Sequence, residues 1–513
     1  MLDRLSLAPG QLVFEPSAGD GVFIDEILEK EPSVRIVAYD LNPEAIGILG
    51  KKYRGVENIK LRQADTLLDS TLDQLARKGG VFDRIIGNPP NGAWQDYDKR
   101  KVLKEKYQGF YVKETYALFL LRCVSVLKKG GILTFIVPDT FLFLHRHTSL
   151  RRFLLQNTEL QEILIIPSKF FPGVSFGYSN LCIITLKKSE SVDTALNNEV
   201  TTIEGLIEES QMDDIRLRNN LGDFSVETIK QNEILKSASS AFLIKSDARI
   251  RNLINHPTCT VGDIAYCVTG IYTGDNRRFI RVSSKTVRGS KDYDVVPADR
   301  INYEHRSLEG ISGHNCFIPL TKGTSENKYL REGFSWYIDW SVAAVEHYKT
   351  DPKARFQNPQ FYFQRGIALP MVKSRRISAT LMDNSVFDQS IVGVFPKDER
   401  LLHYLLGFLN SQIARTILLT INPTANNSAN YVKKMPIVIP PIDVLEEVDE
   451  LVKDIFERVR KKQSIDAIQT ELDGIFEDIF EQEPMGPAKG LLIPRRMSKG
   501  PESTLGPLPL PFH

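Results

Sequence analysis

The segment LVFEPSAGDG, residues 12–21, decides which fold the chain is expected to adopt. Apolar residues lead into Glu15, and Gly19 and Gly21 follow just before an amphipathic run, GVFIDEILEK (21–30). A short apolar run that ends in a glycine-rich turn and enters a helical pattern is typical of a strand, a tight turn and a helix. Glycines in such a turn let the backbone approach a ligand closely, and the helix N-terminus offers free N–H groups.

Further short β-rich runs continue to residue 188, and amphipathic patterns such as TYALFLLRCVSVLKKGG (115–131) separate several of them. The runs are VRIVAY (34–39), NIKLRQ (58–63), FDRIIG (82–87), GILTFIV (131–137), EILIIP (162–167) and LCIITLKK (181–188). Strands that alternate with helices indicate a mainly parallel sheet covered by helices on both faces. We therefore expect an α/β, Rossmann-like domain at the N-terminus.

Composition divides the chain into further segments. We expect a catalytic domain over residues 1–190, a polar linker over 191–240 and a mixed α/β domain over 241–440. Helices with charged faces should occupy residues 441–483, and a proline- and glycine-rich tail, 484–513, is expected to be disordered. Within the mixed domain, LLHYLLGFLNSQIARTILL (401–419) reads as one helical stretch.

Charge and cysteine content narrow the function classes. Residues 241–440 carry 26 basic and 17 acidic side chains although the whole chain has a net charge of only +1, which is compatible with a polyanionic partner. The five cysteines form no C-x-x-C pair, so a structural zinc site is not expected and a reducing cytoplasm is the simplest compartment. No apolar run approaches membrane-spanning length, and no secretory signal is visible, so we expect no membrane association.

Acidic residues stand at the ends of the next two strands. Asp40 ends the second strand, and Asp65 follows the third. An acid at the second strand tip is placed to accept hydrogen bonds from ribose hydroxyls, and Asp65 is placed to accept one from an adenine amino group. Singly, each acid is more readily a turn or N-cap residue. Together with Glu15 they predict a nucleoside site at the carboxyl edge of the sheet.

The fourth strand ends in a stiff turn, Asn88-Pro89-Pro90. Proline fixes φ and lacks a backbone donor, so the turn presents one carboxamide and carbonyls that the local chain does not satisfy. The glycine spacing differs from a dinucleotide fingerprint, because Ile24 stands where the third glycine would fall. A dehydrogenase is therefore not expected.

This set of motifs resembles the S-adenosyl-L-methionine-dependent DNA amino-methyltransferases, specifically the γ-class adenine-N6 enzymes of restriction–modification systems. The match in order and spacing covers roughly residues 12–186. Further segments, such as VTGIYTGDNRRF (268–279), resemble the target-recognition domains of these enzymes more loosely. The resemblance implies a DNA target-recognition role for residues 241–440 and double-stranded DNA as the partner. It implies these cofactor-binding residues: Glu15, Pro16, Ala18, Gly19, Gly21, Asp40, Leu41, Asp65 and Asn88. It implies these catalytic residues: Asn88, Pro89, Pro90, Asn91 and Phe171.

The chemistry of Asn-Pro-Pro supports this interpretation. An exocyclic aromatic amine is a poor nucleophile because its lone pair is delocalised into the ring. The Asn88 carboxamide oxygen and the Pro89 carbonyl can each accept one N–H, which stabilises positive charge as it develops on the nitrogen. The prolines hold both acceptors rigidly for in-line attack on a sulfonium methyl. In duplex DNA the base must first be flipped out of the stack.

The chain departs from the family pattern at two places. The family carries a further cofactor motif around a Thr-Pro pair upstream of the glycine turn, whereas this sequence starts within the helix that would follow it. We expect that a longer upstream frame would complete the cofactor pocket. Asn91 stands where the family has a stacking aromatic, so Phe171 is expected to hold one face of the flipped base, with the other face covered by Asn91 packing edge-on or by Trp94. Phe171 can equally be a core aromatic at a strand–loop junction.

Alternatives within and outside this class remain open. Cytosine-N4 methylation is chemically equivalent, a protein glutamine methyltransferase also uses Asn-Pro-Pro, and a catalytically silent DNA-binding homologue would keep the C-terminal half. No nuclease motif is apparent, so we expect a stand-alone modification enzyme. We also expect a monomer, with a separate restriction endonuclease as a further partner.

Basic residues follow the Asn-Pro-Pro turn and either contact DNA phosphates or form a solvated helix face. They are Lys99, Arg100, Lys101, Lys104 and Lys106. Five further arginines are candidate DNA contacts: Arg277, Arg278, Arg281, Arg375 and Arg376.

Overall fold

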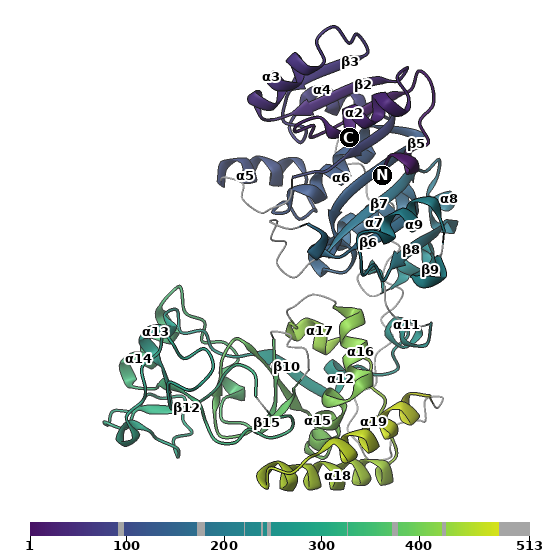
Figure 1. Ribbon diagram of the computed structural model, residues 1–513. Coiled ribbons are helices and arrows are strands. Elements are labelled where there is room, and N and C mark those ends of the chain that lie inside the picture. Colours follow the sequence, from purple (N-terminus) through teal and green to yellow (C-terminus); the bar gives the residue numbers. More distant parts are fainter. Residues whose placement is uncertain are drawn as a thin grey trace. The chain divides into compact units, whose positions relative to one another are not determined.

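The computed structural model divides the chain into two compact units, whose described residues lie within 1–243 and within 248–481 (Figure 1). The residues that it describes are 1–90, 97–171, 180–219, 221–237, 240–243, 248–325, 327–371, 378–422 and 427–481. The predicted disordered tail, 484–513, lies outside these residues.

A nine-stranded sheet forms the centre of the first unit, in the order β3-β2-β1-β4-β5-β7-β6-β8-β9. The pairs from β3 to β5 are all parallel, while β7 runs antiparallel to both β5 and β6. The predicted mainly parallel sheet is thereby confirmed. The strands are β1 (Leu12–Glu15), β2 (Arg35–Asp40), β3 (Ile59–Gln63), β4 (Phe82–Gly87), β5 (Leu127–Pro138), β6 (Thr158–Ile166), β7 (Leu181–Lys188), β8 (Glu199–Glu204) and β9 (Ser225–Lys230).

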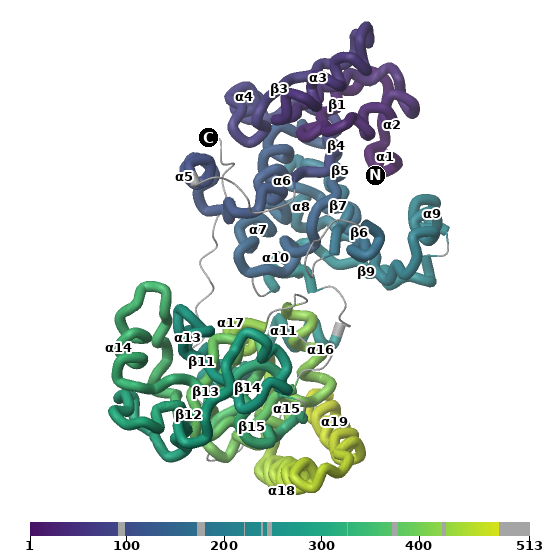
Figure 2. The backbone as a smooth tube through the Cα atoms, turned by 60° about the vertical axis from the view of Figure 1, so that its left-hand side comes forward, coloured from purple at the N-terminus to yellow at the C-terminus, as the bar shows by residue number. Residues whose placement is uncertain are grey.

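Helices cover both faces of this sheet because its central strands are apolar on both sides. Val13 and Ile86 belong to the cluster under α1, α2 and α3, whereas their neighbours Phe14 and Ile85 belong to the cluster under α4, α6 and α7. Figure 2 shows α2 on one side of the sheet and α6 and α7 on the other. The helices are α1 (Leu2–Leu5), α2 (Val22–Lys30), α3 (Pro43–Lys52), α4 (Ser70–Arg77), α5 (Tyr97–Lys106), α6 (Thr115–Val126), α7 (Thr148–Asn157), α8 (Val192–Asn197), α9 (Gln211–Leu217) and α10 (Gln231–Lys236).

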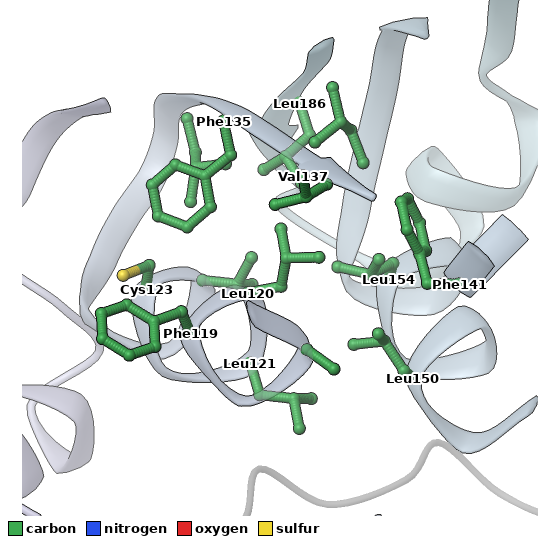
Figure 3. Close-up of a cluster of buried hydrophobic side chains, with 14 of the residues drawn as sticks. Phe119, Leu120, Leu121, Cys123, Phe135, Val137, Phe141, Leu150, Leu154 and Leu186 are labelled. Atoms are coloured by element: carbon green, nitrogen blue, oxygen red, sulfur yellow. The ribbon is translucent and has the colours of Figure 1, made fainter. Parts of the chain in front are cut away.

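Helix α6 forms the middle of the larger core. Eleven of its twelve residues are buried, and Figure 3 shows Leu120 and Cys123 pointing toward side chains from β5 and α7. The run 115–131, which reads as helical, splits at Leu127, where β5 begins. Burial of so many large apolar side chains supplies most of the driving force for folding of this unit.

The segment 191–240, expected as a linker, is instead part of the first unit. Strands β8 and β9 extend the sheet beyond β6, and Gln231 at the start of α10 is fully buried. Its carboxamide donates to the carbonyls of Leu155 and Thr158, both at 2.9 Å, and accepts from the backbone N–H of Leu160. The polar composition of the segment reflects edge strands, which keep polar residues on their solvent side.

The second unit contains two four-stranded sheets, ordered β10-β17-β14-β15 and β11-β13-β12-β16. The strands are β10 (Ala265–Thr269), β11 (Ile280–Val282), β12 (Phe317–Thr321), β13 (Trp336–Asp339), β14 (Gly366–Pro370), β15 (Thr380–Met382), β16 (Val386–Phe387) and β17 (Ile391–Pro396). The helices are α11 (Ala248–Asn255), α12 (Val261–Ile264), α13 (Asn276–Phe279), α14 (Val342–Thr350), α15 (Leu402–Asn410), α16 (Gln412–Ile421), α17 (Ala429–Lys433), α18 (Ile442–Arg460) and α19 (Asp466–Glu481).

The apolar stretch 401–419, which reads as one helix, is two. Ser411 is extended, with ψ of 159°, and its hydroxyl accepts from the backbone N–H of Ala414, so it begins α16 and breaks the hydrogen-bond ladder of α15. Among the described residues no single helix is long and apolar enough to cross a membrane, and only this pair, bent by 72°, passes that test jointly. Phe408 of α15 stacks on Phe480 of α19, so the pair contributes to the core of the second unit.

Replacing Gln231 with Met should lower the free energy of unfolding by about 1–3 kcal/mol, because two buried carbonyls and one N–H would lose their partner. Urea denaturation of the full chain measures this loss. Gln74→Met, at an exposed position of α4, is the matched control and should be close to neutral. Equal stability of the two variants would contradict the integration of residues 191–240 into the first unit.

Candidate cofactor and active site

The two glycines of the β1–α2 turn serve different purposes. Both have positive φ, +54° at Gly19 and +83° at Gly21. A Cβ at Gly21 would lie 2.6 Å from Leu49 Cδ2 and 2.8 Å from Tyr53 Oη, so Gly21 is required by packing against α3. A Cβ at Gly19 would meet nothing within 4 Å. Gly19 therefore borders open space, where a ligand can approach the backbone.

Asp40, at the end of β2, holds this turn. Its Oδ2 accepts from the backbone N–H of Gly19 at 2.8 Å, and its Oδ1 accepts from that of Asn42 at 2.8 Å. Each carboxylate oxygen has a second lone pair, so both can still accept from a ligand hydroxyl. The next residue, Leu41, exposes 58% of its surface, which leaves an apolar side chain beside the turn.

Glu15, the last residue of β1, is a buried carboxyl group in an acidic neighbourhood. Only 1% of its surface is exposed, and no described residue hydrogen-bonds its Oε2. Burial, and secondarily the charges of Asp20, Asp40 and Asp25, raises the pKa of Glu15 to about 9. A buried acceptor among other acids is suited to bind a cationic group, whose charge would offset the cost of ionisation.

The glycine turn, the loop after β3 and the end of β4 are connected by hydrogen bonds. The Thr66 hydroxyl donates to the Pro16 carbonyl at 2.7 Å, and the Ser17 hydroxyl donates to the Asn88 carbonyl at 3.2 Å. The backbone N–H of Ala18 donates to the Tyr39 carbonyl at 2.9 Å. The predicted cofactor motif and the Asn-Pro-Pro turn therefore meet at the carboxyl edge of the sheet.

The Asn-Pro-Pro turn follows β4 directly, and its first residue, Asn88, is exposed to solvent. Asn88 and Pro90 are exposed, while Pro89 is buried. A Cβ at Gly87 would lie 3.3 Å from Phe135 Cε1 and from Pro16 Cδ, so the strand end is tightly packed below the turn. Asn88 is thus exposed to solvent, while the strand end that carries it is tightly packed. Asn91 and Trp94 lie outside the described residues.

Asp65 makes an ion pair that the sequence analysis did not foresee. Its Oδ1 accepts from the backbone N–H of Leu67 at 2.9 Å, and its Oδ2 lies 2.7 Å from Lys99 Nζ on α5. Lys106, also on α5, pairs with Asp73 at 2.9 Å. Two of the five basic residues after the Asn-Pro-Pro turn therefore contact acids of their own unit.

Arg122 is a residue that the sequence patterns did not single out. It is fully buried in α6 and donates to the carbonyls of Thr66 and Asp69, and it pairs with Asp73. The available signal was a single arginine inside an otherwise apolar helix, because a charge at such a position must be paired. Arg122 fixes the loop that carries Asp65.

Phe171 follows the short 3-10 helix Ser168–Phe170 and is partly buried. It packs against an apolar cluster that includes Leu164, Ile183 and Ile203. This packing agrees with the interpretation of Phe171 as an aromatic at a strand–loop junction, and its stacking role stays a prediction.

The candidate DNA contacts of the second unit differ in exposure and in partners. Arg277 and Arg278 are exposed, and Arg277 lies 3.3 Å from Asp292. Arg281 instead donates to the carbonyls of Arg277, Arg278 and Ile280, so it closes the end of α13. Arg375 and Arg376 lie outside the described residues. Over the described ranges, no group of three or more His, Cys, Asp or Glu could hold a metal ion.

Comparison with known proteins relates part of the first unit to restriction–modification methylases. Residues 28–171 match the family described as Eco57I restriction-modification methylase. The type II methyltransferase M.AccI of Acinetobacter calcoaceticus is 27% identical over 161 residues, which cover 30% of this chain and 28% of the relative. The modification methylase CviBIII of Paramecium bursaria Chlorella virus NC1A is 30% identical over 183 residues, which cover 35% and 44%.

Two matches extend over more of the chain. The adenine-specific methyltransferase BrxX of Escherichia coli O9:H4 (strain HS) is 20% identical over 366 residues, 70% of this chain and 28% of the relative. The solved structure of a DrdV–DNA complex covers 87% of this chain and 54% of that one, at 13% identity and a TM-score of 0.53. The chain thus spans less than half the length of the curated relatives named here.

The first unit has a mostly parallel sheet, and the chain is similar in fold to the solved DrdV structure. Residues 28–171 are similar to the restriction–modification methylases of the Eco57I type.

Glu15→Gln should stabilise the ligand-free protein at pH 8 by roughly 3–5 kcal/mol. The carboxyl stays protonated in the fold up to pH near 9, whereas in the unfolded chain it ionises above its ordinary pKa of 4.5. Unfolding is therefore increasingly favoured as the pH rises from about 4.5 to 9, and the neutral amide removes this cost.

Urea denaturation at pH 5 and pH 8 measures the difference. Glu29→Gln, at an exposed position of α2, is the matched control and should change little at either pH. The same gain for Glu15→Gln at both pH values would contradict a buried, protonated Glu15.

Proposed function

We propose that this protein is a site-specific DNA methyltransferase that transfers a methyl group from S-adenosyl-L-methionine to adenine N6, as the modification enzyme of a restriction–modification system. The observation that carries the proposal is the direct connection between the glycine turn and the exposed Asn88 through the Ser17 hydroxyl, beside the buried Glu15. The names of the relatives support it, since they include type II methyltransferases and an adenine-specific enzyme.

The residues at the sheet edge fit this cofactor. Glu15 offers a buried carboxylate for the amino group of the methionine part, and Gly19 leaves room for close approach of the backbone. Asp40 would accept from the ribose hydroxyls, Leu41 would pack on the adenine ring, and Asp65 would accept from its amino group. Bound S-adenosyl-L-methionine supplies an electrophilic methyl group on a sulfonium.

Asn88 and the two prolines would orient the target nitrogen. The Asn88 carboxamide oxygen and the Pro89 carbonyl accept one N–H each, which favours a pyramidal, electron-rich nitrogen and stabilises the charge that develops during transfer. Because the Asn88 backbone carbonyl accepts from Ser17, the turn is held beside the glycine turn. The geometry of attack is thereby set by position rather than by a general base.

The second unit is proposed to recognise the DNA sequence. Residues 241–440 hold a surplus of basic over acidic side chains, 26 against 17, and the exposed Arg277 and Arg278 would contact phosphates. The target base would be flipped into the site, with Phe171 as one stacking face. We further propose a cytoplasmic monomer that acts with a separate restriction endonuclease.

Asn88→Ala should reduce methyl transfer to DNA by at least about 100-fold, because one acceptor for the developing charge is lost. Incorporation of tritium from labelled S-adenosylmethionine into DNA measures the rate. DNA binding should change little, since Asn88 is exposed and its backbone contact is retained. Asn219→Ala, at an exposed position two residues after α9, is the control, and full activity of Asn88→Ala would remove Asn88 from the mechanism.

Asp40→Ala should weaken cofactor binding by about 1.5–3 kcal/mol, through loss of a charged acceptor and of the contact that holds Gly19. Isothermal titration calorimetry with S-adenosylmethionine measures this change. Asp193→Ala, an exposed acid of α8, should bind as the parent does. Unchanged affinity of Asp40→Ala would show that the ribose is held elsewhere.

A further inference from the structure

Helix α5, which follows the Asn-Pro-Pro turn, presents one face to the loop after β3. Lys99, Leu103 and Lys106 are spaced by four and three residues and so share a face of the helix. Leu103 is fully buried, and Lys106 pairs with Asp73 of α4. The following residue, Tyr107, is fully buried and donates to the Leu67 carbonyl at 2.9 Å. The C-terminal end of α5 is therefore anchored in the core.

The N-terminal end of α5 is tied to the proposed cofactor site itself. Lys99 contacts Asp65 Oδ2, while Asp65 Oδ1 is engaged by the N–H of Leu67 within the loop. Lys99 and the Leu67 N–H therefore contact different oxygens of the Asp65 carboxylate. The two side chains are 27% and 21% exposed, so the ion pair is partly solvated and can be exchanged for another donor.

We propose that Lys99 is a switch that couples cofactor binding to DNA binding. This inference rests on the proposed function, in which the adenine amino group of the cofactor donates to Asp65. The cofactor and Lys99 then compete for the same carboxylate oxygen. Once the adenine amino group holds Asp65, the Lys99 ammonium is released to a DNA phosphate.

The charge of α5 as a whole indicates where the released lysine would act. Lys101 and Lys104 are exposed beside the exposed Asp98 and Glu105, and the helix carries five basic and two acidic side chains, so a released Lys99 would add one free cation to a net positive helix. A site that gains one cation when the cofactor binds should hold DNA more tightly in its presence. Because coupling between two ligands is reciprocal, DNA should raise cofactor affinity by the same factor.

The first test is calorimetric titration of the full chain with S-adenosylhomocysteine, which cannot transfer a methyl group. Lys99→Met should raise affinity about two- to fivefold, which corresponds to loss of a partly exposed ion pair that competes with the ligand. Lys104→Met removes the same charge from an exposed position of the same helix and should leave affinity unchanged. In an Asp65→Ala background, Lys99→Met should have no effect.

The second test measures binding of a 30-base-pair duplex of mixed sequence as a function of salt. With S-adenosylhomocysteine, the parent chain should bind the duplex more tightly. The slope of log affinity against log salt should become steeper by about the amount expected for one additional phosphate contact. Lys99→Met should show the same affinity and slope with and without the cofactor analogue. Lys104→Met should keep the response to the analogue.

The outcomes separate the switch from the function on which it rests. If the parent chain does not bind S-adenosylhomocysteine, the proposed function fails. If it binds, but Lys99→Met binds no more tightly than Lys104→Met, the switch is wrong while the cofactor site stands. If the parent chain binds the duplex equally tightly with and without S-adenosylhomocysteine, the proposed switch is also wrong.

Discussion

The hydrogen bond from the Thr66 hydroxyl to the Pro16 carbonyl joins two loops on which the whole candidate site depends. On one side, the glycine turn carries Gly19 and leads back to Glu15 at the end of β1. On the other, the loop after β3 carries Asp65. The buried Arg122 donates to the Thr66 carbonyl and to that of Asp69, so one guanidinium in the core holds this loop in place. Such fully paired buried networks give loops one defined geometry, which a binding site requires.

The site also contains a group that costs stability. Glu15 is buried beside Asp20 and Asp40, and its raised pKa of about 9 shows that the fold disfavours its charged form. A protein has no structural reason to bury an acid without a hydrogen-bond partner for each oxygen, since the same position would accept an apolar or amide side chain at lower cost. The cost is understandable if a cationic ligand completes the site.

Much of the first unit could be predicted from the sequence, because each strand is a short apolar run that ends in a polar residue or a turn. The positions of Glu15, Asp40 and Asn88 at strand ends follow from these runs. The partners of Lys99 and Arg122 could not be predicted, because an ion pair between residues far apart in sequence depends on tertiary packing. The inclusion of 191–240 in the sheet was missed for a related reason. Its strands lie at the sheet edge, where alternating polar residues resemble those of a linker.

The central claim is that Asn88 and the adjacent cofactor site methylate adenine N6 in DNA. Sequencing of modified bases in the genome of a cell that expresses this chain tests it most directly, with a cell that expresses Asn88→Ala as the reference. We expect N6-methyladenine at one short sequence motif in the first cell and none at that motif in the second. N4-methylcytosine at a motif, or no new modified base from a folded and expressed chain, would contradict it.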